Sequence, residues 1–322
     1  MPEPKPVVFV TRKLPEAVEA RLLADYRPIL NPDDRPYGPE ELLEKAREAD
    51  AILTCGTEKW PASLIERLPE RVRIIATFSV GYEHIDIEAC RRRGIVVTNT
   101  PEVLTEATAD IALLCLLGAA RRAYEAQRDL RAGRWTRWGA TQYLGLGLQD
   151  RVLGIVGMGR IGRAVARRAR GFGLRIHYHN RRRLPPELEA GATYHETLDA
   201  MLPHCQFLSV NCPGSPENVN LLDARRIALL PKGAVVVNTA RGNIIEEKAL
   251  LAAVKSGHLF AVGLDVYQNE PNVDPEWFGI DNAFLLPHIG SATIETRNAM
   301  GFCCLDNLDA FFAGKPVPNP VT

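Results

Sequence analysis

Short apolar runs alternate with stretches of helical periodicity along most of the chain. Four such runs fall in the first hundred residues: VVFV at 7–10, ADAILTC at 49–55, VRIIATFSVG at 72–81 and GIVVTNT at 94–100. Segments with helical spacing, such as PEAVEARLLADY and GPEELLEKAREA, lie between them. Runs rich in β-branched residues that alternate with helices are typical of parallel βα units.

The same alternation resumes after residue 150. Six further runs follow: RVLGIVGMG, LRIHYHN, CQFLSVNC, GAVVVNTARG, LFAVGLDVY and NAFLLPHIG. An apolar helix over about 106–122 and a loop rich in Gly and Trp separate the two sets, and a helix over about 291–313 follows the second. We therefore expect an α/β protein with two domains, each a doubly wound parallel sheet.

Composition excludes several classes of protein. Lys plus Arg and Asp plus Glu number 39 each, so no net charge draws the chain to nucleic acid or to an anionic membrane. The most apolar run, 109–120, is too short to span a bilayer and contains Asp110. The seven cysteines lack paired metal-ligand spacing and no signal peptide is recognisable. We expect reduced thiols, no metal site and a cytoplasmic location.

A glycine-rich turn follows the first run of the second set. Gly157, Gly159 and Gly162 have the GxGxxG spacing between an expected strand and an expected helix. The first glycine permits a tight turn, the second lets backbone approach a pyrophosphate, and the third lets helix and strand pack closely. The pattern predicts a dinucleotide site, and its alternative is a glycine-rich turn without a ligand.

The end of the next strand indicates which dinucleotide binds. NAD enzymes place an Asp or Glu there to accept hydrogen bonds from the ribose 2′-hydroxyl. Here Asn180 is followed by Arg181, Arg182 and Arg183, and no carboxylate occurs before Glu187. A guanidinium binds phosphate in bidentate fashion, so the run favours NADP(H), with Arg181 a stronger candidate than Arg183. Arginines that only cover the surface are the alternative, and NAD(H) is the alternative cofactor.

Three residues with catalytic potential follow later apolar runs. Arg241, Glu270 and His288 are each expected at the carboxyl edge of a sheet, where open α/β folds bind ligands. Reduction of a ketone needs a proton donor, which histidine supplies near neutral pH. A carboxylate near it favours the imidazolium, and an arginine can hold a substrate carboxylate. Taken singly, each residue could equally be structural.

Several motifs in the same order resemble the D-isomer-specific 2-hydroxyacid dehydrogenase family. They are GMGRIG, VNTARGNIIEEKAL, GLDVYQNEP and LLPHIGSAT, while VVFVTRKLPE and FSVGYEHID are similar to its glyoxylate and hydroxypyruvate reductases. The resemblance covers essentially the whole chain. It implies a flavodoxin-like substrate domain (1–102 and 290–322) and a Rossmann-type dinucleotide-binding domain (103–289), with the active site in the cleft between them.

The resemblance also implies residue roles. His288 would be the acid–base catalyst, Glu270 would orient and charge it, and Arg241 would bind the substrate carboxylate and carbonyl. Backbone N–H groups of Val80 and Gly81 would bind the carboxylate. Trp138 would either shape the substrate pocket, here or in a neighbouring subunit, or form part of an interface core. The cofactor contacts would be Thr108, Gly157, Gly159, Arg160, Ile161, Gly162, Asn180, Arg181, Arg182, Cys212, Pro213, Thr239, Ala240, Asp265, His288 and Gly290. Asn218 departs from the family pattern, since relatives often have Thr there.

We therefore expect a homodimeric, NADPH-preferring reductase of glyoxylate or hydroxypyruvate. Two alternatives stay open. One is another dehydrogenase of the family, acting on phosphoglycerate, D-lactate, formate or phosphite. The other is a non-catalytic scaffold that senses dinucleotides, like the corepressors that share this fold. Consumption of NADPH in the presence of a 2-oxo acid distinguishes an enzyme from a scaffold.

Overall fold

The computed structural model describes residues 4–322, so the first three positions of the expected segment 1–102 lie outside it. The chain divides into two compact units. Unit 1 contains the described residues up to Leu104 together with Ser291–Thr322, and unit 2 is Thr105–Gly290.

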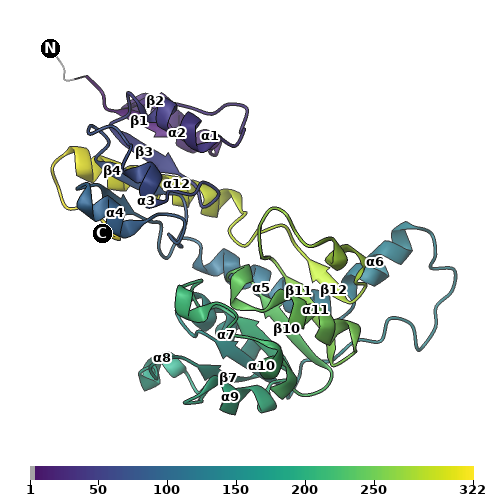
Figure 1. Ribbon diagram of the computed structural model, residues 1–322. Coiled ribbons are helices and arrows are strands. Elements are labelled where there is room, and N and C mark those ends of the chain that lie inside the picture. Colours follow the sequence, from purple (N-terminus) through teal and green to yellow (C-terminus); the bar gives the residue numbers. More distant parts are fainter. Residues whose placement is uncertain (1–3) are drawn as a thin grey trace. The chain divides into compact units, whose positions relative to one another are not determined.

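Unit 1 is built on a parallel five-stranded sheet with the order β2-β1-β3-β4-β5 (Figure 1). This is the flavodoxin-like strand order. The strands are β1 Val7–Val10, β2 Arg27–Ile29, β3 Ala51–Thr54, β4 Ile74–Thr77 and β5 Val96–Thr98. The helices are α1 Glu16–Asp25, α2 Pro39–Ala46, α3 Ala62–Ile65, α4 Ile87–Arg92 and α12 Ile294–Phe312.

Unit 2 is built on a parallel seven-stranded sheet with the order β12-β11-β10-β9-β6-β7-β8. Its strands are β6 Val152–Val156, β7 Arg175–His179, β8 Thr193–Tyr194, β9 Phe207–Val210, β10 Ala234–Asn238, β11 Leu259–Leu264 and β12 Ala283–Leu285. Its α-helices are α5 Thr105–Ala120, α6 Ala123–Arg131, α7 Arg160–Gly171, α8 Pro186–Glu189, α9 Leu198–Met201, α10 Ala224–Leu229 and α11 Glu247–Lys255. Short 3₁₀ turns are η1 Leu202–His204, η2 Pro216–Asn218, η3 Gly242–Ile244 and η4 Pro275–Gly279.

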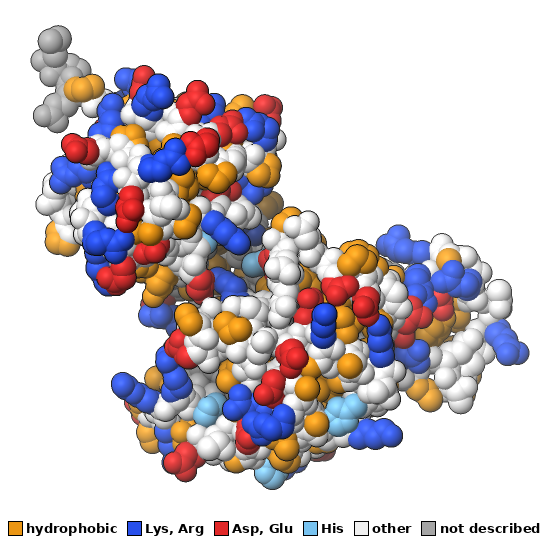
Figure 2. Space-filling model, viewed as in Figure 1, with side chains coloured by type: hydrophobic (Ala, Val, Ile, Leu, Met, Phe, Trp, Pro, Cys, Tyr) orange, Lys and Arg blue, Asp and Glu red, His pale blue; other side chains and the backbone are white. Residues whose placement is uncertain are grey.

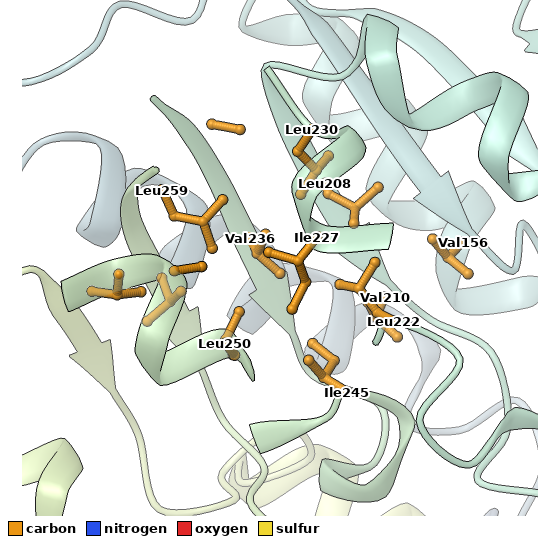
Figure 3. Packing of buried hydrophobic residues seen from close by; sticks show 14 of the residues in the cluster. Val156, Leu208, Val210, Leu222, Ile227, Leu230, Val236, Ile245, Leu250 and Leu259 are labelled. Atoms are coloured by element: carbon orange, nitrogen blue, oxygen red, sulfur yellow. The ribbon is translucent and has the colours of Figure 1, made fainter. Parts of the chain in front are cut away.

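The central strands β6, β9 and β10 of unit 2 are buried on both faces because helices cover both faces. Val152 and Val156 pack on the side of α10 and α11, whereas Leu153 and Ile155 pack on the side of α5 and α7. Figure 3 shows the first of these clusters, in which Val236 of β10 lies beside Ile227 and Leu250. This double burial explains why the sequence shows continuous apolar runs instead of alternation.

The predicted fold class is confirmed: both units are doubly wound α/β structures with parallel sheets. The strand order of unit 2 reverses direction between β6 and β9, and such switch points are where these folds bind ligands. Basic and acidic side chains are interspersed on the faces visible in Figure 2. No helix within residues 4–322 has the length and apolar character needed to cross a membrane.

Candidate active site

The glycine-rich turn has the geometry that its spacing predicts. Gly157 follows β6 with a φ of +88°, and a Cβ there would lie 2.6 Å from the backbone nitrogen of Cys212. A Cβ on Gly162 would lie 2.4 Å from the carbonyl oxygen of Gly157, so α7 can pack here only on a glycine. A Cβ on Gly159 would meet nothing within 4 Å. The open side of the turn is therefore at Gly159, where a pyrophosphate is expected to approach.

The residues after β7 divide into two groups. The Asn180 Oδ1 accepts a 2.6 Å hydrogen bond from the Met158 N–H, which ties the end of β7 to the glycine-rich turn. Arg183 forms a bidentate ion pair with Glu189, at 2.8 and 3.1 Å, and lies over the Tyr194 ring. Arg181 and Arg182 are exposed, and the Arg181 Nη1 lies 3.0 Å from the Glu217 Oε1. Arg183 is thus held by Glu189, six residues further along the same segment.

Glu217 is a residue that sequence reasoning missed. It lies in η2, in the loop that follows β9, and only the sheet order brings it beside the end of β7. In the same loop, the Asn218 Nδ2 donates to the Pro213 carbonyl at 2.9 Å, so Asn218 shapes the segment that carries Cys212 and Pro213. Burial raises the pKa of the Cys212 thiol to about 11.

Four predicted cofactor residues lie deeper in unit 2, namely Thr108, Thr239, Asp265 and Gly290. Asp265 is 1% exposed, its Oδ1 accepts from the Ile289 N–H at 2.7 Å, and burial raises its pKa. A Cβ on Gly290 would lie 3.2 Å from the Asp265 Oδ2 and 3.5 Å from Thr108. The Asp265 Oδ2 and the Thr239 Oγ1 are both buried without a hydrogen-bond partner among the described residues. Such orphaned groups fit a polar ligand, because a buried polar atom without a partner is costly.

His288 and Glu270 form a hydrogen-bonded pair. The His288 Nδ1 lies 2.5 Å from the Glu270 Oε2, and the other carboxylate oxygen of Glu270 accepts from the Tyr267 N–H at 2.7 Å. Burial alone would raise the pKa of Glu270, but the hydrogen bond with His288 and the charges of His288 and Arg241 lower it overall. The side chain of His288 is 50% exposed.

The backbone at His288 is strained. Its φ of +55° lies in the left-handed region, which costs free energy for a residue other than glycine. The hydrogen bond between the next residue, Ile289, and Asp265 holds this conformation. Asp265 therefore helps to fix the backbone direction at His288, after the end of β12.

Arg241 lies after β10, on the same edge of the sheet as the pair. Its Nη1 donates to the Ala240 carbonyl at 2.8 Å, and the side chain packs so close to Gly214 that a Cβ there would lie 2.6 Å from the Arg241 Cγ. Since Arg241 is among the charges that lower the pKa of Glu270, the three predicted catalytic residues are electrostatically linked within unit 2.

The remaining predicted residues have simpler settings. Arg160 begins α7 and is exposed, whereas Ile161 is partly buried against the core beneath that helix. Val80 and Gly81 lie in unit 1, in the turn that follows β4, and both are half-buried. Trp138 is 78% exposed in the loop after α6. Residues 4–322 contain no group of three or more His, Cys, Asp or Glu side chains arranged to hold a metal ion.

Residues 113–290 match the family described as D-isomer specific 2-hydroxyacid dehydrogenase, NAD binding domain. The chain belongs to this dehydrogenase family. A glyoxylate reductase of Thermococcus litoralis is 42% identical over 98% of this chain and 97% of its own length. A glycerate dehydrogenase of Hyphomicrobium methylovorum is 41% identical over 96% and 97%, respectively.

A solved structure shows the same likeness in three dimensions. The NADPH-dependent glyoxylate/hydroxypyruvate reductase of Sinorhizobium meliloti, solved with NADP and malonate, matches this dehydrogenase with a TM-score of 0.89. The sequences are 36% identical, and the match covers 99% of this chain and 97% of that one. This 2-hydroxyacid dehydrogenase is thus an oxidoreductase that uses a nicotinamide dinucleotide, as the resemblance predicts.

Proposed function

We propose that this dehydrogenase reduces glyoxylate or hydroxypyruvate to the 2-hydroxy acid, prefers NADPH, and uses His288 as the proton donor. The observation that carries the proposal is the His288–Glu270 pair with Arg241 on the same sheet edge. Relatives named for glyoxylate, hydroxypyruvate and glycerate support the substrate class, because glycerate is the product of hydroxypyruvate reduction.

The pair has the arrangement that proton donation requires. Because the Glu270 carboxylate holds the Nδ1 of His288, the Nε2 is the ring nitrogen that is free to donate to the carbonyl oxygen of the substrate. Glu270, whose pKa is lowered, stays ionised and holds the ring in one orientation through Nδ1. As the carbonyl oxygen takes the proton it becomes the hydroxyl of the product, and His288 regains its proton from water.

Substrate binding is assigned to Arg241 and to the backbone N–H groups of Val80 and Gly81. A guanidinium and backbone N–H groups favour acids over neutral ketones, because a carboxylate accepts charge-assisted hydrogen bonds from such donors. Reduction also requires a hydride, which the reduced nicotinamide supplies when it is bound. Thr108, Asp265 and Gly290 would hold that ring. Thr108 and the Asp265 Oδ2 both lie close to Gly290, and this oxygen is buried without a hydrogen-bond partner among the described residues.

Arg181 and Arg182 would bind the 2′-phosphate of NADPH. Glu217 competes with the phosphate for Arg181, because its carboxylate pairs with that guanidinium and carries the same sign of charge as the phosphate. Arg181→Ala is expected to weaken NADPH binding by about 10- to 100-fold and NADH binding little. Glu217→Gln is expected to strengthen NADPH binding. Arg183→Ala is the matched control, because Arg183 is paired with Glu189 and should not distinguish the two cofactors.

Fluorescence titration of each variant with NADPH and with NADH measures these affinities. Equal losses for both cofactors in Arg181→Ala would overturn the NADPH assignment. The substrate assignment is tested separately: a panel of 2-oxo acids is assayed with both cofactors. Turnover of glyoxylate or hydroxypyruvate supports it, and turnover of neither overturns it.

The loop after α6 is proposed as a contact with a second copy of the chain. Apolar side chains are unusually exposed there: Trp135 is 48% exposed, Trp138 78% and Leu144 60%, and Leu130 near the end of α6 is 59% exposed. Such a concentration marks an interaction surface. If Trp138→Ala both dissociates the dimer and raises KM for the 2-oxo acid, Trp138 contributes to the substrate pocket of a neighbouring subunit. A wild-type protein that is monomeric in solution would refute the dimer.

A further inference from the structure

In the turn that follows β4 in unit 1, three consecutive carbonyl groups each accept a hydrogen bond from another group of the chain. The Ser79 carbonyl accepts from the Thr100 N–H at 3.0 Å. The Val80 carbonyl accepts from the Asn99 Nδ2 at 2.8 Å, and the Gly81 carbonyl accepts from the Ser79 hydroxyl at 2.6 Å. Within residues 4–322, the N–H groups of Val80 and Gly81 donate to no acceptor.

Fixing these carbonyls fixes the N–H groups. A trans peptide unit is planar, so the C=O of one residue and the N–H of the next point in opposite directions. The hold of Thr100 on the Ser79 carbonyl therefore orients the Val80 N–H. In the same way, the hold of Asn99 on the Val80 carbonyl orients the Gly81 N–H. Hydrogen bonds to the carbonyls therefore preorganise the Val80 and Gly81 N–H groups as a pair of donors.

Asn99 is itself anchored by the end of the chain. Its backbone N–H donates to the Asn319 carbonyl at 3.3 Å. Asn319 in turn exchanges hydrogen bonds of 2.9 and 3.0 Å with the side chain of Asn307, which is fully buried in α12. The segment that contains Asn319 also runs beside β5, where the Val321 N–H donates to the Val97 carbonyl at 2.8 Å.

We propose that Asn99 is a positioning residue for substrate binding: its side chain fixes the Gly81 N–H, and Asn307 and Asn319 hold Asn99 in place. This inference rests on the proposed function, in which Val80 and Gly81 bind the substrate carboxylate. Ser79 assists from the next peptide, because its hydroxyl holds the Gly81 carbonyl. Asn99 touches neither the substrate nor the reacting atoms.

Asn99→Asp tests the role with almost no change in side-chain shape. The variant loses the amide donor and places a carboxylate oxygen against the Val80 carbonyl, so this peptide is expected to rotate away. Because misplacement of a binding group by about 1 Å can cost about a hundredfold, we expect KM for glyoxylate and for hydroxypyruvate to rise at least about tenfold. The kcat and the affinity for NADPH are expected to change little.

A binding measurement accompanies the kinetics. Oxamate, which carries a carboxylate next to a carbonyl but is not reduced, is titrated into the enzyme with NADPH, and its Kd is expected to rise in parallel with KM. Ser79→Ala should show the same pattern with a smaller rise. Asn298→Asp is the matched control, because it is the same change in α12, at a residue outside the set that holds the turn.

The outcomes separate this inference from the proposed function. If wild-type enzyme reduces no 2-oxo acid, the proposed function fails. If it does, and folded Asn99→Asp keeps the wild-type KM and oxamate Kd, only the positioning role fails. Should Asn99→Asp not fold, Asn99→Ala decides the matter, because it removes the same donor without adding a charge, and wild-type values for that variant overturn the positioning role. An equal loss of NADPH and oxamate affinity would mean a general structural defect, which also overturns it.

Discussion

In the proposed mechanism, the groups that act at the carboxyl edge of the seven-stranded sheet are side chains, namely those of Arg241, Glu270 and His288. The groups proposed to act at the carboxyl edge of the five-stranded sheet are the backbone N–H groups of Val80 and Gly81. The function proposed for the first set depends on side-chain charge and proton affinity. The function proposed for the second set depends on the hydrogen bonds to the Ser79 and Val80 carbonyls, which orient the N–H groups. Substitution of His288 or Glu270 should therefore change kcat, whereas loss of the hydrogen bonds that orient the Val80 and Gly81 N–H groups should change KM.

The strongest test of this contrast is His288→Gln. Glutamine can keep a hydrogen bond to Glu270 but cannot donate a proton as a general acid, so kcat should fall by about 10²- to 10⁴-fold. Stopped-flow and steady-state assays measure the loss, and NADPH titration should give nearly wild-type affinity. His258→Gln is the control, since His258 contacts the Ile227 carbonyl away from this edge. A His288→Gln enzyme with most of its kcat would remove the catalytic role.

A smaller loss is expected for Glu270→Gln. The change removes the negative charge beside His288 and replaces one oxygen with an amide N–H group, so the ring is no longer held in one tautomer. We expect kcat to fall by about tenfold to a thousandfold, with KM for the 2-oxo acid nearly unchanged. If KM rose instead while kcat stayed constant, Glu270 would resemble the unit 1 turn and the contrast would fail.

The difference between the two edges also explains what the sequence could predict. Motif spacing predicted His288, Glu270 and the glycine-rich turn as site residues because their chemistry resides in residue types. The role proposed for Asn99 could not be predicted in this way, because it depends on a hydrogen bond to the carbonyl of a residue 19 positions earlier. The Arg181–Glu217 pair likewise depends on strand order, since 36 positions separate its partners. The strand runs themselves were predictable because burial on both faces leaves a continuous apolar signal.

Glu58 extends the comparison to a carboxylate of unit 1. It is 6% exposed and accepts from the Thr11 hydroxyl at 2.7 Å, the Thr57 hydroxyl at 2.6 Å and the Cys55 N–H at 3.1 Å. Because it holds the loop after β3, Glu58→Gln should destabilise the fold by about 1–3 kcal/mol and leave kcat unchanged. Urea denaturation measures this, with exposed Glu44→Gln as the control. Normal stability with reduced kcat would place reactive side chains on both sheet edges.

The smallest expected effect concerns histidines that lie away from either edge. His177, His195 and His204 cluster in unit 2, and the His195 Nε2 lies 3.0 Å from the His177 Nδ1. Burial, together with the charges of His195, His204 and Arg175, lowers the pKa of His177 to about 4. The pKa of His195 is lowered for similar reasons.

The sign of the resulting pH dependence follows from which state binds the proton. An unfolded chain protonates His177 near its ordinary pKa of about 6.5, whereas the folded chain does so only near 4. The contribution to stability is therefore complete above about pH 6.5 and is lost as the pH falls toward 4. Since His177 is partly exposed, we expect only about 1 kcal/mol. His177→Gln should flatten the fall in unfolding free energy over this range while kcat stays at the wild-type value. Parallel pH curves for the two proteins would show that the cluster does not contribute, and a loss of kcat would show that catalytic histidines are not confined to the sheet edge.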